Sequence, residues 1–337
     1  METNAKQPRR RASPAWLLFF LAPAVGELLT SAAPPAKFFN PFYFLVVCIL
    51  YGGGAVMVRE LTCRWRKGWA AVLLLGAAFA VVEEGLMMKS FFDPAWGGLG
   101  PYGAYGRWMG VNWVWSLALT ISHAIVSIGV PVLLVHLLFP ARRNEPWVGR
   151  WTFRLLAILF TADVMFGALA LTRYRVPSSL YLSAMGVAAG FYLLARISPG
   201  ASMESLPVTT VTPRHPFWFA LVGFVNTLGL FLLPFLLPAR GIHSLLVMLA
   251  IVLLTTGAST VLVMLCGRVS ATLPKQQLGL AAGVLSFYIL LAPIWEFVAA
   301  HRGNMQGMTV VAILASLFLA GVAWSLKKSA LPSELTN

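Results

Sequence analysis

Two adjacent glutamates, Glu83 and Glu84, lie inside an apolar run that extends from Trp69 to Phe91. A carboxylate in the hydrocarbon region of a membrane costs about 2.5–3.5 kcal/mol even on the more lenient insertion scales. His123 lies deep in the next apolar run along the chain. Carboxylates and imidazoles take and give protons readily, so we expect these three residues to form a functional site.

The histidine belongs to a polar stripe within its apolar run. The stripe residues follow one another in steps of four, four, three and four, which places them on one face of a helix. They are Asn112, Ser116, Thr120, His123 and Ser127. Five aligned polar residues predict a face that is turned toward protein or water rather than lipid. At 1.5 Å per residue, Glu84 and His123 both lie roughly 7–10 Å below the outer boundary, so we expect them to be level.

The composition identifies the class of protein. Of the 337 residues, 59% are hydrophobic and only 11% are charged, and the mean hydropathy is +0.79. Soluble domains carry about 25% charged residues, so a multi-pass membrane protein is indicated. The net charge of +14 comes from Lys and Arg placed between the apolar runs. This pattern is typical of topology signals and contact with membrane lipids, and it argues against nucleic-acid binding.

Ten apolar runs approach the roughly 20 residues that a transmembrane helix needs. Alternating ten-residue segments typical of membrane barrels are absent, so the sequence predicts an all-α transmembrane bundle. The predicted spans are residues 15–33, 41–58, 69–91, 108–139, 151–172, 179–196, 216–238, 242–266, 278–299 and 307–326. No cysteine pair has the spacing of a redox motif or a disulfide framework.

The basic residues orient this bundle. With both termini inside, 18 of the 25 Lys and Arg residues fall on the cytoplasmic side, as the positive-inside rule requires. We expect an integral protein of a bacterial cytoplasmic (inner) membrane. The predicted organisation is a basic cytoplasmic N-terminus (1–14), a six-span front half carrying the site (15–196), a cytoplasmic linker (197–215), a four-span back half (216–326) and a cytoplasmic tail (327–337).

The first apolar run follows three arginines and imitates a secretory signal peptide. Glu27 within it and the following prolines favour a retained first helix. We expect Glu27 to pair with an arginine or to line the same cavity as the glutamate pair. Arg59 and Glu60 are expected to form a surface ion pair at the cytoplasmic end of the second span. Asp163 and Glu296 are expected to make hydrogen bonds between helices.

The local geometry around the glutamates adds three expectations. Neighbouring residues point about 100° apart on an α-helix, so one glutamate should face the site and the other should accept a supporting contact. Gly76, on a preceding turn, should let another helix approach closely. The outer segment from Phe91 to Arg107 is rich in Gly, Pro and aromatic residues. It is either an aromatic belt with a tight loop or a half-inserted lid over a site below it.

A glutamate pair in one span followed by a histidine in the next resembles the CAAX-protease and bacteriocin-processing (CPBP) family of glutamate intramembrane proteases. In that family, two glutamates are followed after three residues by an arginine, an aromatic residue precedes a histidine by four, and a third motif joins a histidine to Asn or Asp. Glu83 and Glu84 match the start of the first motif, with Met88 at the arginine position. His123 matches the second, with Leu119 in place of the aromatic residue, and the third motif is missing.

The resemblance, which covers residues 83–127, implies hydrolysis of a peptide bond in a membrane-embedded substrate. Glu84 or Glu83 would take a proton from water, His123 would orient that water or protonate the leaving group, and Asn112 would donate to the oxyanion. No cofactor is predicted. The same Glu-Glu-His set could bind zinc, but a ligand spacing such as HExxH is absent, so no metal site is predicted. Two alternatives stay open: a proton-coupled carrier that uses the same residues as an ion relay, and a non-catalytic membrane protein with a structural polar cluster.

Overall fold

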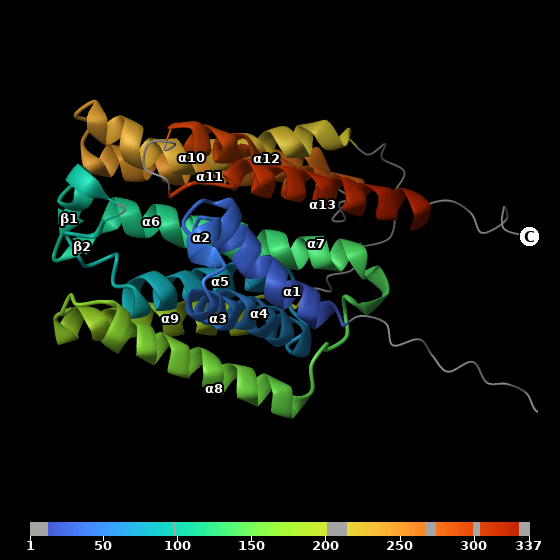
Figure 1. Cartoon of the computed structure of the whole chain (residues 1–337), viewed down its shortest axis with the longest axis horizontal. Coiled ribbons are helices and arrows are strands. Elements are labelled where there is room, and N and C mark those ends of the chain that lie inside the picture. Colours follow the sequence, from blue (N-terminus) through green and yellow to red (C-terminus); the bar gives the residue numbers. More distant parts are fainter. Residues whose placement is uncertain (1–12, 98, 201–213, 267–273, 299–303, 330–337) are drawn as a thin grey trace, which may run out of the picture.

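The computed structural model describes residues 13–97, 99–200, 214–266, 274–298 and 304–329 (Figure 1). Within this part of the chain, nine helical segments are long and apolar enough to cross a membrane, so the predicted all-α bundle is confirmed. They are α3–η2–α4 (Pro41–Val47, Cys48–Gly52, Gly53–Arg64), α5–η3 (Trp69–Ala80, Val81–Met87), α6–η5–α7 (Trp113–Ser122, His123–Gly129, Val130–Leu138), α8–η7 (Arg150–Phe166, Gly167–Leu171), α9 (Ser178–Ile197), α10 (Pro216–Ala239), α11 (Ser244–Cys266), α12 (Pro274–Val298) and α13 (Met308–Ser329).

A shorter apolar helix takes the place of the first predicted span, residues 15–33. It consists of α1 (Pro14–Pro23) and the π-helical η1 (Ala24–Leu29), which have 10 and 6 residues. At most about 24 Å long, it does not reach the roughly 30 Å of a hydrocarbon core. The helix ends because Ser31 turns to a φ of 67°. The segment nevertheless packs in the core, where Leu18 is fully buried.

The start of α1 and the end of α13 lie at the same end of the bundle (Figure 1). The nine membrane helices and the shorter α1–η1 helix together therefore return the chain to the end at which α1 begins. The assignment of that end to the cytoplasm rests on the distribution of Lys and Arg. Most of the predicted N-terminal segment, linker and C-terminal tail (residues 1–12, 201–213 and 330–337) lie outside the described residues.

Helix starts follow the local sequence closely. Proline occupies the first turn of α1, α3 and α10, where its fixed φ suits the helix and its missing N–H leaves no bond unmade. The Asn40 side chain caps α3 by accepting hydrogen bonds from two backbone N–H groups of the first turn. Asn112 caps α6 in the same way. The fourth membrane helix therefore begins at Trp113 rather than at Trp108, and the third ends at Met87 rather than at Phe91.

The segment between these two helices crosses the outer end of the bundle. It contains the 3-10 helix η4 (Gly100–Gly103) and a two-stranded antiparallel hairpin, β1 (Arg107–Trp108) and β2 (Val111–Asn112). The hairpin turn uses Met109 and Gly110, whose φ angles of 48° and 81° are those of a tight two-residue turn. Residues 108–112 are therefore not helical, although the sequence predicts a helix there. Their backbone groups pair across the hairpin instead, Arg107 with Asn112 and Trp108 with Val111.

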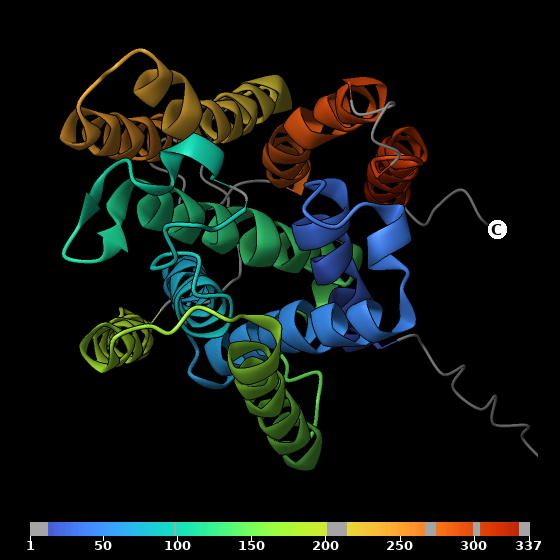
Figure 2. The same cartoon turned by 60° about the vertical axis from the view of Figure 1, so that its left-hand side comes forward.

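The segment Trp113–Leu138 runs through the middle of the bundle (Figure 2, green). Its most apolar stretch is 72% buried, against 61% for Trp69–Met87 and 11% for α9, α11 and α13. The back helices α10–α13 pack on one another and reach the front half mainly through α6 and α7. The outer helices therefore present apolar surface to lipid. The protein interior is formed by the third and fourth membrane helices together with Pro41–Arg64, whose most apolar stretch is also 61% buried.

A second polar cluster lies at the end of the second membrane helix that the distribution of Lys and Arg predicts to be cytoplasmic. Arg59 and Glu60 form the expected ion pair, at 2.7 Å, but both side chains are fully buried, so the prediction of a surface pair is wrong. The Arg59 guanidinium donates to the carbonyls of Arg142 and Arg143 and stacks 3.6 Å above the Trp147 ring. Glu60 accepts a hydrogen bond from the backbone N–H of Trp147. These contacts hold the loop after α7 against the second helix.

The third and fourth membrane helices touch at Gly76. A Cβ added there would lie 2.8 Å from the Cα of Ala124, the residue after His123. Real Cβ atoms do not approach a backbone atom this closely, so the absence of a side chain lets the two helices meet beside the histidine. The predicted close approach at Gly76 is confirmed.

We expect Gly76→Ala to lower the thermal unfolding midpoint of the purified protein in detergent. Overpacking at a backbone contact costs about 1–3 kcal/mol. Gly53→Ala is the matched control, because Gly53 is also buried and helical but has no atom within 4 Å of an added Cβ. Both substitutions bring the same helix-propensity gain of about 1 kcal/mol. Equal midpoints for the two variants would contradict the close approach.

Candidate functional site

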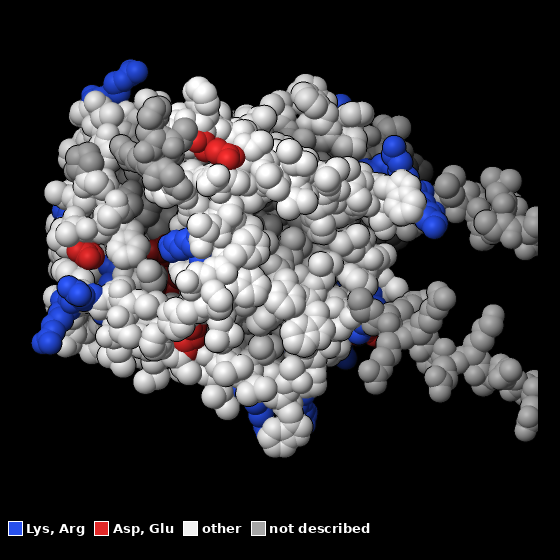
Figure 3. Space-filling view, viewed as in Figure 1, with Lys and Arg blue, Asp and Glu red and all other residues white. Residues whose placement is uncertain are grey.

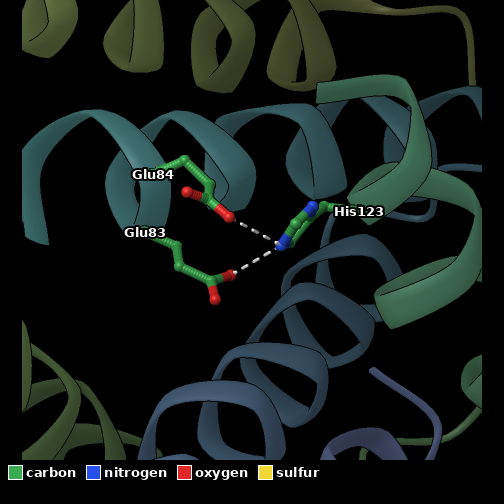
Figure 4. A group of neighbouring side chains, drawn as sticks. All are labelled: Glu83, Glu84 and His123. Carbon is green, nitrogen blue, oxygen red and sulfur yellow. Dashed lines mark ion pairs between the residues drawn. The ribbon is translucent and has the colours of Figure 1, made fainter. Parts of the chain in front are cut away.

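Glu83, Glu84 and His123 converge in the outer half of the bundle (Figure 4). The Nε2 atom of His123 lies 3.2 Å from Oε2 of Glu83 and 3.7 Å from Oε1 of Glu84. The side chains are 10%, 4% and 14% exposed for His123, Glu83 and Glu84, so the three groups interact in a largely dry environment. The depths of these residues along two different spans predicted that they are level, and the structure does bring them together.

Both glutamates face the histidine, which corrects the expectation that only one would. The reason is local: Val81–Met87 is π-helical, and a π-helix winds more slowly, so neighbouring side chains diverge less than on an α-helix. The two oxygens of each carboxylate contact different groups. One oxygen points toward His123, and the other is held by a hydroxyl from another part of the chain.

The support for Glu83 comes from Tyr51 on the second membrane helix. The Tyr51 hydroxyl contacts Oε1 of Glu83 and also lies 2.7 Å from Oε1 of Glu27. The other oxygen of Glu27 accepts a hydrogen bond from Tyr43 at 2.7 Å. Glu27 therefore joins the site through Tyr51, and no arginine pairs with it among the described residues.

The number of hydrogens limits how Tyr51 can bond to both Glu27 and Glu83. The Tyr51 hydroxyl carries one hydrogen and can donate to only one of its two carboxyl neighbours. The other contact is a hydrogen bond only if that carboxyl group is protonated and donates to the phenol oxygen. Glu27, Tyr51 and Glu83 together therefore share one extra proton, which can sit at either end of the chain.

Glu84 and His123 are held by different partners. The Ser90 hydroxyl donates to Oε2 of Glu84, and the Trp115 indole donates to Ser90 at 3.2 Å. The Nδ1 atom of His123 lies 3.0 Å from the carbonyl oxygen of Leu119, so Nδ1 carries a hydrogen and donates it. Nε2 is then the nitrogen free to exchange a proton or bind a ligand on the side of the carboxylates.

The site residues all come from π-helical segments. Glu27 lies in η1, Tyr51 in η2, both glutamates of the pair in η3, and His123 is the first residue of η5. Short π-helical turns inside α-helices are rare and occur frequently at functional sites. The extra residue of each such turn rotates the side chains that follow it around the helix axis. Here the turns of four separate helices direct these side chains toward one point.

Sequence reasoning did not find Tyr43, Tyr51 or Ser90. A signal for Tyr51 was present in the chain, because Gly26 precedes Glu27 directly. A Cβ at Gly26 would lie 2.6 Å from the Tyr51 ring, so only glycine lets the ring reach the carboxylate. The stripe Asn112, Ser116, Thr120, His123 and Ser127 does face protein, since none of its residues is exposed.

The structure does not bring Asn112 into the cluster. Its side chain caps α6 and donates to the carbonyl of Tyr102 at 3.2 Å, so its amide is committed to the outer loop. The ten residues of α6 separate it from His123, a distance of about 15 Å along the helix. The expectation that Asn112 would donate to an oxyanion beside His123 is therefore corrected by this placement.

The other charged candidates also lie apart. Lys89 donates to the carbonyl of Ala168 at 2.6 Å and makes no ion pair with the glutamates, so it does not replace the arginine of the first CPBP motif. Glu296 accepts hydrogen bonds from backbone N–H groups at the start of α13, which confirms a contact between helices. Asp163 is buried in α8, and its Oδ2 has no hydrogen-bond partner among the described residues.

Residues 16–335 match the family model of an uncharacterized membrane protein family. The chain belongs to this family. No curated protein and no solved structure matches the chain. For this member of the family, the resemblance to CPBP proteases is carried by Glu83, Glu84 and His123 alone, and the comparisons show no link to those proteases. The family match and the helices together show an integral, multi-pass membrane protein.

We expect Tyr51→Phe to destabilise the protein by about 1–3 kcal/mol, because it removes the hydroxyl that contacts two buried carboxyl groups. Thermal unfolding in detergent measures the effect. Tyr288→Phe is the control, since Tyr288 is also buried but its hydroxyl makes no hydrogen bond within the described part of the chain. If the two variants unfold at the same temperature, the tyrosine bridge does not hold the site together.

Proposed function

We propose that the protein is an intramembrane hydrolase that cleaves a peptide bond in a membrane-embedded substrate, in the cytoplasmic membrane of a bacterium. One observation supports this proposal above the others. An imidazole nitrogen from one membrane helix lies within 4 Å of two carboxylates from another, and each of the three groups is oriented by a further hydrogen bond. Such oriented acid–base sets are what hydrolysis of an unactivated bond needs.

The chemistry follows from the positions of the polar atoms. A water held beside Glu84, whose side chain is 14% exposed, gives a proton to Glu84 or Glu83, and its oxygen attacks the carbonyl carbon of the substrate. The tetrahedral intermediate then loses the amine, which receives the proton held by the carboxylic acid, either directly or relayed through Nε2 of His123. The hydroxyl of the water ends on the acyl product and its proton on the amine, and the site returns to its starting state.

A purely structural cluster fits the geometry less well. Structural polar clusters in membranes are fully paired, because an unpaired polar atom in a dry interior is costly. Oε2 of Glu83 is buried and has no hydrogen-bond partner among the described residues, although it points at His123. The Arg59 cluster at the other end of the same bundle shows the contrast, with its guanidinium bonded to Glu60 and to two backbone carbonyls.

Glu83→Gln, Glu84→Gln and His123→Ala are each expected to lower the cleavage rate by about 10²–10⁴-fold, the contribution of a positioned acid or base. The measurement uses proteoliposomes loaded with a library of membrane-spanning peptides, with mass spectrometry of the products. Asp163→Asn is the control, because it removes a buried carboxyl group of another membrane helix that lies outside the cluster. Cleavage at the wild-type rate in any of the three site variants would refute the assignment.

A proton-coupled carrier is the second candidate, and the Glu27–Tyr51–Glu83 chain favours it. The proton shared along this chain can move from Glu27 to Glu83 by reversal of the Tyr51 hydroxyl. A carrier needs such a relay between its site and one face of the membrane. In the hydrolase, the same chain would only restore protons to the site.

Proton flux separates the two candidates. For the hydrolase, we expect proteoliposomes under an imposed pH gradient and membrane potential to show no more proton flux than empty liposomes, read with an enclosed pH-sensitive dye. The Tyr51→Phe protein should behave identically in this assay. Proton flux that is present with the wild-type protein and absent with Tyr51→Phe would refute the hydrolase and support the carrier. The reason is that this variant interrupts the proton chain without removing a carboxylate.

A further inference from the structure

We infer that Glu83, Glu84 and His123 form a binding site for one divalent transition-metal ion of the zinc type. The ligand atoms of the three residues all lie within 4.8 Å of one another. Two ligand atoms each about 2.1 Å from a tetrahedral Zn²⁺ are about 3.4 Å apart. The separations of Nε2 of His123 from the two glutamate oxygens, 3.2 and 3.7 Å, lie on either side of this value.

The tautomer of His123 is the one that a metal ligand needs. Nδ1 donates to the carbonyl of Leu119, so Nε2 is the nitrogen that faces the carboxylate oxygens. Either a proton on Nε2 or a cation between the three groups satisfies this arrangement, and a bound metal ion would take the place of that proton. Metal-bound histidines almost always donate their other ring nitrogen to a carbonyl or carboxylate in this way.

An independent observation comes from Glu83. Its side chain is 4% exposed, and Oε2 has no hydrogen-bond partner among the described residues, while Oε1 is held by Tyr51. The unpartnered oxygen points into the space shared with His123 and Glu84 (Figure 4). A buried carboxylate oxygen without a partner is strongly unfavourable, and an ion at the centre of the cluster would satisfy it.

The charge balance also calls for a cation. Three carboxyl groups, those of Glu27, Glu83 and Glu84, are linked through Tyr51 and His123. In the described part of the chain, no Lys or Arg lies within ion-pair distance of any of them. The ammonium group of Lys37 lies 4.5 Å from the centre of the Tyr43 ring and makes no ion pair with these glutamates. The compensating positive charge must therefore be protons or a bound metal ion.

The supporting contacts are those of a metal site. Tyr51 holds Glu83, Ser90 holds Glu84, and the Leu119 carbonyl holds His123, so each ligand is oriented by a second group. Two carboxylates and one imidazole suit Zn²⁺, whereas Ca²⁺ and Mg²⁺ prefer six or more oxygens, including water. Sequence spacing did not predict the site, because its ligands come from two helices rather than from one HExxH turn.

Three protein ligands leave one tetrahedral position open, which is the arrangement of catalytic rather than structural zinc. Glu84 is the most exposed of the three ligands, at 14%. Figure 3 shows acidic atoms in the depth of a hollow toward the outer end of the molecule. This part of the inference rests on the proposed hydrolase, since the open position would hold the attacking water.

Metal analysis of the full chain tests the site. The protein is purified in detergent without a polyhistidine tag, stripped with a chelator, exposed to Zn²⁺ or Co²⁺ and passed through gel filtration. We expect about one ion per chain, and with Co²⁺ a visible absorption band of four- or five-coordinate geometry. Glu83→Gln, Glu84→Gln and His123→Ala should each lose the ion, and Asp163→Asn should keep it. Tyr51→Phe should weaken binding by about 10–100-fold, as the loss of an orienting contact does.

The result that overturns the site is a folded, monodisperse wild-type protein that retains neither ion and whose unfolding midpoint does not rise with added Zn²⁺. Equal metal content in wild type and the isosteric Glu→Gln variants would overturn it as well. The outcome is separable from that of the hydrolase. Cleavage by protein that retains no ion would keep the hydrolase and reject the metal site, whereas a bound ion without cleavage would keep the metal site and reject the hydrolase.

Discussion

Burial of carboxyl groups in a membrane is the constraint on which the rest of this structure depends. Each buried oxygen of Glu27, Glu83 and Glu84 must find a proton, a donor or a cation inside the protein, because lipid offers none. Tyr51 satisfies two of the three glutamates at once and is itself fully enclosed. The first, second, third and fourth membrane segments are therefore arranged around one phenol group and one imidazole.

The backbone meets this constraint with π-helical turns. A regular α-helix would separate the side chains of Glu83 and Glu84 by about 100° and send one of them toward another surface. The π-helical stretch after Ala80 lets both approach His123, and similar stretches carry Glu27, Tyr51 and His123 itself. Such turns lose hydrogen-bond quality in the helix, so their coincidence at one point indicates that the tertiary contacts there compensate for it.

The second membrane helix carries two polar clusters that differ in kind. Near its outer half, Tyr51 contacts carboxyl groups that still have an oxygen without a partner. Eight residues later, Arg59 is bonded to Glu60 and two carbonyls, and it stacks on Trp147. The second cluster is fully paired at Arg59 and ties the loop after α7 to the bundle. The first is incomplete without a proton, a water or an ion, which is the property expected of a site that binds something.

The sequence by itself determined the all-α membrane architecture, the order of the nine membrane helices, and the three residues of the central cluster, but it counted the short α1–η1 helix as a tenth span. Runs of apolar residues reveal spans, and a charge inside such a run is conspicuous because it is costly there. The sequence also led to errors at Asn112, whose capping role depends on a hairpin that helix periodicity does not reveal.

Only the tertiary structure decided which faces meet. Lipid and protein interior are both apolar, so a membrane helix carries little periodic signal for the side that faces its neighbours. Tyr51 could not be assigned to the site for this reason, and for Glu27 the choice between an arginine partner and the site stayed open, although Gly26 makes the contact of the two residues possible. The π-helical turns depend on the same packing: contacts between helices, rather than local propensity, place both glutamates, the tyrosine and the histidine at one point.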